Sequence, residues 1–104
     1  MDFFVMISYD LHNADSDCYK HFKDSLQDIG LNDFLTDKAK NGPIELPSTT
    51  VCGVVSGSGR KSIKNDLKKK VNELFTHCEV SGTSFMTVAE TCSVVLRRYN
   101  RRND

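Results

Sequence analysis

The residues of this chain that are best suited to chemistry lie close to its N-terminus. Asp10 follows the apolar run Phe3-Phe4-Val5-Met6-Ile7, and His12, Asp15 and Asp17 come directly after it. A carboxylate at the end of a buried strand is solvated enough to stay charged, while the strand fixes its position. These residue types and this spacing suit either a metal site or a solvated loop that caps a helix, and both interpretations stay open.

Asp10 is the candidate catalytic group. Aspartate binds Mg²⁺ or Mn²⁺, ions that favour oxygen ligands and keep several waters. Such an ion could polarise a phosphodiester and activate a water molecule. One carboxylate is too few for a closed site, so a two-fold homodimer that brings two copies of Asp10 together would supply a pair. His12 is an auxiliary candidate, as general base or ligand, because histidine titrates near neutral pH.

Hydrophobic periodicity predicts two amphipathic helices, at about 16–29 and 61–77. It predicts strands at about 3–9, 31–36, 48–56 and 85–89, and residues 92–99 can add a fifth strand. The segment Asp37 to Pro47 contains Asn41-Gly42-Pro43, which predicts a turn or an extended loop. Ser81-Gly82 predicts another turn.

This order of elements predicts an α+β fold, a ferredoxin-like βαββαβ sandwich that forms a single domain over residues 1–104. The handedness of crossover connections places both helices on one face of an antiparallel sheet. The strands at about 3–9 and 48–56 become the central pair. The opposite face of the sheet stays open, and a second subunit or another protein could cover it.

Composition narrows the class of protein. No apolar stretch approaches the roughly 20 residues of a membrane span, and residues Met1-Asp2 lack the basic start of a secretory signal. We therefore expect a cytoplasmic protein that does not enter membranes. The four cysteines are widely spaced and form no CxxC pair, which indicates free thiols rather than a zinc site or disulfides.

The formal net charge is +0, but the two halves of the chain differ. Residues 1–59 hold four lysines against nine acidic residues, whereas residues 60–104 hold ten Lys or Arg against five. This asymmetry indicates an anionic partner, self-association, or simply a solvated helix face and a basic tail at about 100–104. The candidate contacts to nucleic-acid phosphates are Arg60, Lys61, Lys64, Lys68, Arg97, Arg98, Arg101 and Arg102.

The segment Gly57-Ser58-Gly59-Arg60-Lys61-Ser62 follows a predicted strand and begins a helix, as a phosphate-binding loop does. It fails the GxxxxGK[ST] pattern, which argues against ATP hydrolysis. Its amides and basic side chains could still hold a nucleic-acid phosphate. An RNA-recognition sheet is excluded, because the strand at about 48–56 has no aromatic residue.

The opening Val5-Met6-Ile7-Ser8-Tyr9-Asp10-Leu11 resembles the small CRISPR-associated endoribonuclease two family, and the virulence-associated protein D ribonucleases look similar at this level. The resemblance implies a ferredoxin-like homodimer whose first strand ends in the metal-binding catalytic aspartate. That role falls on Asp10, with Ser8 and Tyr9 as neighbours. A C-terminal strand, at about Cys92 to Tyr99, would pair across the dimer. The segment Asp37 to Pro47 is longer than the family's hairpin, and some members are architectural subunits.

Two functions remain open. The first is a homodimer that engages nucleic acid and acts as a Mg²⁺- or Mn²⁺-dependent endonuclease on RNA or DNA. The second is a non-catalytic dimeric module, antitoxin-like or architectural, that binds another protein. The near-zero net charge favours the second, since strong nucleic-acid binders are commonly basic overall.

Overall fold

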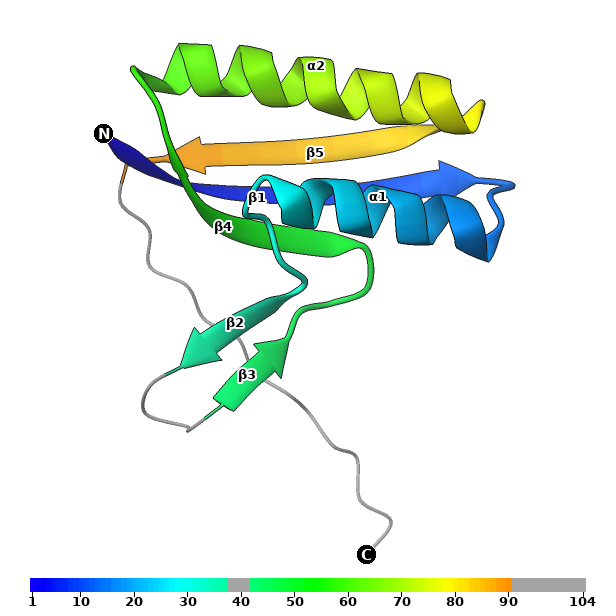
Figure 1. Ribbon diagram of the computed structural model, residues 1–104, viewed down its shortest axis with the longest axis horizontal. Helices are drawn as coiled ribbons and strands as arrows, with labels where there is room; N and C mark the ends of the chain where they lie inside the picture. The colour runs from blue at the N-terminus through cyan, green and yellow to red at the C-terminus, as the bar shows by residue number, and fades with distance from the viewer. Residues whose placement is uncertain (38–41, 91–104) are drawn as a thin grey trace, which may run out of the picture.

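The computed structural model describes residues 1–37 and 42–90. Figure 1 shows the helices and strands of these ranges. Their bounds are Asp2–His12 (β1), Ser16–Asp28 (α1), Phe34–Asp37 (β2), Gly42–Glu45 (β3), Thr50–Ser56 (β4), Arg60–Cys78 (α2) and Ser81–Ala89 (β5). The C-terminal strand expected at about 92–99 and the basic tail at about 100–104 lie outside the described residues.

The core forms on one face of β1. The odd-numbered residues from Phe3 to Leu11 are all buried, and the residues between them are half-buried or exposed. Because side chains alternate between the two faces of a strand, this pattern defines a covered face and an open face. The same buried cluster takes in side chains of both helices, namely Cys18, Phe22, Leu26, Ile63, Leu67, Val71 and Leu74. Both helices therefore cover one face, as the sequence predicts.

Among the described residues, the sheet that carries this core has three antiparallel strands in the order β4-β1-β5. β1 pairs with β4 from Asp2↔Ser56 to Ser8↔Thr50, which confirms the expected pairing of the strands near 3–9 and 48–56. The two strands are not a central pair in this sheet, because β5 takes the other side of β1 and leaves β4 at the edge. It pairs with β5 on its other side, up to His12↔Ser81. Since both neighbours are antiparallel to β1, they run parallel to each other, and α2 connects them. This arrangement is compatible with the expected sandwich.

The segment that the sequence predicts as a loop contains a strand. β3 pairs with β2 in a separate two-stranded sheet, from Phe34↔Glu45 to Asp37↔Gly42. Pro43 is tolerated because β3 has β2 as its one strand partner among the described residues, and proline is allowed on such an edge. Figure 1 shows this hairpin projecting below the three-stranded sheet. In the described ranges, a single bridge, Asn32↔Cys52, links the segment before the hairpin to β4.

Ser81-Gly82 lies inside β5 rather than in a turn. Gly82 sits against the backbone carbonyl of Asp10 and the ring of Phe75, where a Cβ would collide with both. Glycine is needed here because β5 approaches β1 closely. Glycine is also common in turns, which is why the sequence predicts a turn at this position. The chain instead leaves α2 at Glu79, which adopts a left-handed conformation with φ of 54°.

The open face of the sheet carries apolar side chains. Val54 of β4 is 62% exposed and Phe85 of β5 is 65% exposed. The strand register places them opposite Phe4 and Ser8 of β1, which are both half-buried. In the described part of the chain, no helix combines the length and the apolar character needed to cross a membrane.

Candidate functional site

Asp10 lies near the end of β1 and points to the open face of the sheet. Its side chain is 74% exposed, and Nε2 of His12 lies 3.8 Å from its Oδ2. Asp10 stands opposite Thr83 of β5 in the strand register. A central strand therefore holds this carboxylate in solvent, which is the setting expected from the sequence.

The other acidic residues of the N-terminal cluster stabilise the start of α1. Oδ1 of Asp15 accepts a hydrogen bond from the backbone N–H of Cys18 at 2.9 Å, so Asp15 caps the helix. Asp17 lies in the first helical turn, where a negative charge is favourable. Within residues 1–37 and 42–90, no three His, Cys, Asp or Glu side chains are placed to hold one metal ion. A Mg²⁺ or Mn²⁺ ion at Asp10 would need further oxygen ligands from water, from a substrate phosphate or from a second copy.

Strand alternation separates the expected neighbours of Asp10. Ser8 is on the open face with Asp10 and His12, and its Oγ lies 3.5 Å from Oγ1 of Thr50. Tyr9 points to the covered face, where its ring centroid lies 5.3 Å from that of Phe22. Ser8 and His12 thus flank Asp10, whereas Tyr9 belongs to a different environment.

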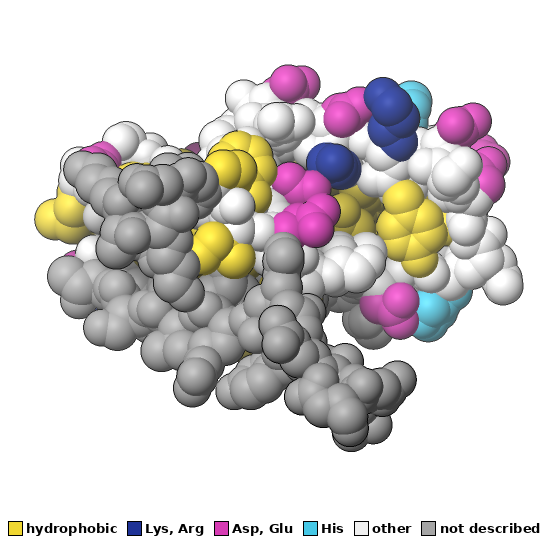
Figure 2. Space-filling model, turned by 90° about the horizontal axis from the view of Figure 1, so that it is seen from below, with side chains coloured by type: hydrophobic (Ala, Val, Ile, Leu, Met, Phe, Trp, Pro, Cys, Tyr) yellow, Lys and Arg dark blue, Asp and Glu magenta, His cyan; other side chains and the backbone are white. Residues whose placement is uncertain are grey.

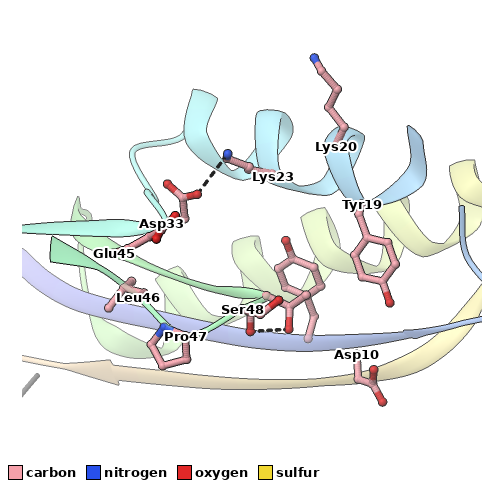
Figure 3. A pocket seen from close by; sticks show the side chains of 11 residues that line it. Asp10, Tyr19, Lys20, Lys23, Asp33, Glu45, Leu46, Pro47 and Ser48 are labelled. Atoms are coloured by element: carbon pink, nitrogen blue, oxygen red, sulfur yellow. Dashed lines mark hydrogen bonds and ion pairs between the residues drawn. The ribbon is translucent and has the colours of Figure 1, made fainter. Parts of the chain in front are cut away.

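That environment is a cavity of about 940 Å³ between α1, the end of β1 and the connection from β3 to β4. Figure 3 shows side chains from these segments around it, and in Figure 2 acidic, basic and apolar side chains border one another on the surface. Asp10 lies at the cavity's edge, so the candidate catalytic group and the cavity are adjacent. The remaining lining residues are Tyr9, Tyr19, Lys20, Lys23, Asp33, Glu45, Leu46, Pro47, Ser48 and Thr49.

Salt bridges neutralise the lysines of this cavity. Nζ of Lys23 lies 3.1 Å from Oδ2 of Asp33 and ties α1 to the segment before β2 (Figure 3). Nζ of Lys20 lies 3.1 Å from Oδ2 of Asp24, one helical turn further along α1. Glu45 has no ion pair within the described residues. Among the described residues, the cavity therefore keeps negative charge without a lysine partner at Glu45 and, beside His12, at Asp10.

The hydroxyl of Tyr9 faces this cavity. Tyr9 is 6% exposed, and its hydroxyl has no hydrogen-bond partner among the described residues. Burial, followed by the charge of Asp33 and then Tyr19, raises the pKa of Tyr9 above its ordinary value, so the hydroxyl stays protonated at neutral pH. By contrast, the Tyr19 hydroxyl donates to the carbonyl of Leu11 at 3.1 Å. Tyr9 thus offers a neutral donor that the protein leaves unused.

The backbone beside Tyr9 is strained. Thr49 has a φ of 57°, which is unusual for a β-branched residue. Its carbonyl accepts a hydrogen bond from the Tyr9 N–H at 3.0 Å, and the N–H of Thr50 donates to the carbonyl of Pro47 at 3.2 Å. These bonds hold the turn that forms one side of the cavity.

The basic residues of α2 form a second candidate surface. We define the α2 stripe as Arg60, Lys61, Lys64 and Lys68, which are all exposed. Lys61, Lys64 and Lys68 share one side of the helix, because their spacing follows the helical repeat. No carboxylate lies within ion-pair distance of the stripe in the described part of the chain, in contrast to the paired lysines of α1. Arg97, Arg98, Arg101 and Arg102 lie outside the described residues.

Sequence reasoning missed the cavity, because its walls come from segments that are far apart in the chain. Lys20 and Lys23 look like an ordinary solvated helix face. Asp33, Glu45 and Ser48 fall in the segment with the weakest pattern. Of the residues that line the cavity, Tyr9 gave the one usable signal in the sequence, as an aromatic residue immediately before Asp10.

Comparison of the chain with protein-family models, with curated proteins and with solved structures gives no match.

Proposed function

We propose that this protein binds nucleic acid through the α2 stripe and acts as a homodimer. The observation that carries the proposal is the difference between the two helices. Both lysines that α1 contributes to the cavity are ion-paired, whereas the stripe has no acidic partner in the described residues. Lys61 and Lys68 are seven residues apart, so the three lysines span about 10 Å of helix. Unpaired cations in a row suit a chain of phosphates, whose contacts supply most of the affinity.

The stripe and Asp10 are separated by β5. Lys64 and Lys68 line a shallow cavity of about 380 Å³ together with Ser84 and Met86 of β5. Ser84 is the register partner of Tyr9, and Thr83 is that of Asp10. A bound strand would therefore cross the outer edge of β5 to reach Asp10 on the other face. β5 has one strand partner in the described sheet, so backbone N–H groups on its outer edge are free to donate to phosphates.

Hydrolysis is the second part of the proposal. Asp10 would hold Mg²⁺ or Mn²⁺, and the ion would polarise the phosphodiester and activate water. We propose that the complete fold is ferredoxin-like and that a second copy covers the open face of the sheet. The exposed Val54 and Phe85 support this arrangement, because both lie on the open face of the same sheet and a second copy would remove them from water. A two-fold axis near this face would bring a second Asp10 into the site.

Cleavage assays with Asp10→Asn test the catalytic part. Labelled single- and double-stranded RNA and DNA are incubated with the protein in Mg²⁺, in Mn²⁺ and in EDTA. The expected result is metal-dependent cleavage that Asp10→Asn reduces to background, while Asp17→Asn, a matched change in the helical turn next to the site, leaves it intact. Equal cleavage by the wild type and Asp10→Asn would remove Asp10 from the mechanism.

The exposed apolar face also supports the alternative function, a dimeric module that binds a protein without catalysis. Added salt separates the two functions. Phosphate contacts weaken steeply with salt, whereas an apolar interface is nearly indifferent to it. Failure to cleave any of these substrates, combined with salt-insensitive association, would favour the interaction module.

A further inference from the structure

We propose that the cavity beside Asp10 binds the nucleoside attached to the phosphate that Asp10 faces. The inference rests on the proposed function, and it adds a binding subsite to it. Three observations on the described residues carry it: the position of the cavity, the balance of its charges and the unused hydroxyl of Tyr9.

The first observation is the position of the cavity. Asp10 lies at its edge, and the walls come from α1 and from the connection between β3 and β4 (Figure 3). The carboxylate of Asp10 points out of the cavity towards the open face of the sheet (Figure 3), so a nucleotide that bends around the end of β1 could place its phosphate at Asp10 and its nucleoside in the cavity. The volume of about 940 Å³ falls in the range of small-molecule sites.

The second observation is the charge balance. Lys23 is neutralised by Asp33 and Lys20 by Asp24, which leaves Glu45 and Asp10 as the excess charges. This excess repels a second phosphate inside the cavity. The sugar and base are uncharged and carry hydroxyl and amino donors, so they suit carboxylate acceptors such as those of Glu45 and Asp33. The negative charge of the cavity therefore favours the uncharged sugar and base over the phosphate in its interior.

The third observation is the donor on Tyr9. Its ring is packed on Phe22, so the hydroxyl is held in one place without a protein partner in the described ranges. No buried side-chain nitrogen or oxygen atom of the described residues lacks a partner, so the Tyr9 hydroxyl reaches the open volume of the cavity and is available to a ligand there. A base or sugar oxygen is a suitable acceptor for it. Because the pKa of Tyr9 is raised, the hydroxyl remains a donor throughout the neutral range.

Titration of the ¹⁵N-labelled protein with each uncharged nucleoside, in EDTA, tests the subsite by amide chemical shifts. The expected result is saturable shifts at Tyr9, Tyr19, Ser48 and Thr49. Tyr9→Phe removes the hydroxyl alone and should weaken binding about fivefold, the usual effect of one hydrogen bond. Lys70 lies on the flank of α2 beside Ile29 and Val55 and belongs neither to the cavity nor to the stripe, so Lys70→Gln should leave the dissociation constant unchanged. The amide spectrum of each variant reports whether it is folded.

Two results would overturn the inference. One is the same set of shifts with inorganic phosphate alone, which would make the cavity a phosphate site. The other is shifts confined to α2, or no saturable shifts at millimolar nucleoside. Because binding is measured without metal, it is independent of cleavage. Loss of cleavage in Asp10→Asn without cavity binding would refute the subsite and keep the nuclease. Cavity binding combined with cleavage that does not depend on Asp10 would support the subsite and refute the nuclease.

Discussion

Neutralising two lysines of the α2 stripe should halve the salt dependence of nucleic-acid binding. The stripe offers four cations that have no acidic partner in residues 1–37 and 42–90, and each phosphate contact to a single strand contributes about −0.7 to the slope of log affinity against log salt. We therefore expect a slope of about −2.8 for the wild type, which corresponds to a loss of about 50-fold between 50 and 200 mM salt. Lys64→Gln with Lys68→Gln should reduce the slope to about −1.4 and the loss to about sevenfold.

Fluorescence anisotropy of a labelled single-stranded oligonucleotide, measured at several KCl concentrations, gives both slopes. The matched control is Lys69→Gln with Lys70→Gln, which removes the same charge from the same helix. Lys70 faces the other flank of α2, where it lines a cavity with Ile29 and Val55. The control should therefore keep most of the wild-type slope. Equal slopes for the two double variants would show that total charge matters rather than the stripe, and a wild-type slope near zero would refute phosphate binding.

Three other perturbations test the fold and its open face. Phe85→Glu should abolish self-association in sedimentation experiments and change the free energy of unfolding by less than about 0.5 kcal/mol, because Phe85 is exposed; an unchanged dimer would contradict a face-to-face interface. Gly53→Ala should lower the free energy of unfolding in urea by about 2 kcal/mol or more, since the added methyl collides with the carbonyl of Gly30. The control is Gly59→Ala, where a Cβ meets nothing within 4 Å, and it should lower the free energy of unfolding by less than about 1 kcal/mol. Burial, then contact with Cys78 and the charge of Asp15, raises the pKa of Cys18 from 9.0 to about 11, so the unfolded state loses this proton first. The contribution of Cys18 to stability should consequently be constant below about pH 9 and decrease towards pH 11, so Cys18→Ala should lose less stability than the wild type over that range; no difference between the two profiles would refute it.

The strongly periodic parts of the chain could be predicted from the sequence. The run around Val5 and Ile7, the apolar residues of α1 and the apolar residues of α2 each carry one clear repeat, and the structure buries them in one cluster. The loop after β1 caps α1, which is one of the two interpretations that the sequence leaves open, and the structure uses Asp15 for this cap. The exposed position of Asp10 could be predicted from β1 alone, because the apolar run indicates where this strand leaves the core.

Pairing between distant segments was not predictable from local patterns. Pro43 and Gly82 are residues that usually end strands, yet each lies within one. Their partners, Thr36 in the hairpin and Leu11 in β1, decide the outcome, and local propensity carries no information about those partners. The cavity is non-local for the same reason. The salt bridge between Lys23 and Asp33 depends on where the chain returns after α1, which the helical repeat does not specify.

The weak attachment of the β2–β3 hairpin has a consequence for hydrogen exchange. Two strands alone are marginally stable in water, and one bridge, Asn32↔Cys52, ties the segment before the hairpin to β4 in the described residues. The hairpin can therefore open as a local unit while the β4-β1-β5 sheet stays folded. Amides of Leu35 and Ile44 should exchange much faster than that of Ile7. Because Glu45 ends β3 and lines the cavity, each opening would widen the cavity without disturbing Asp10.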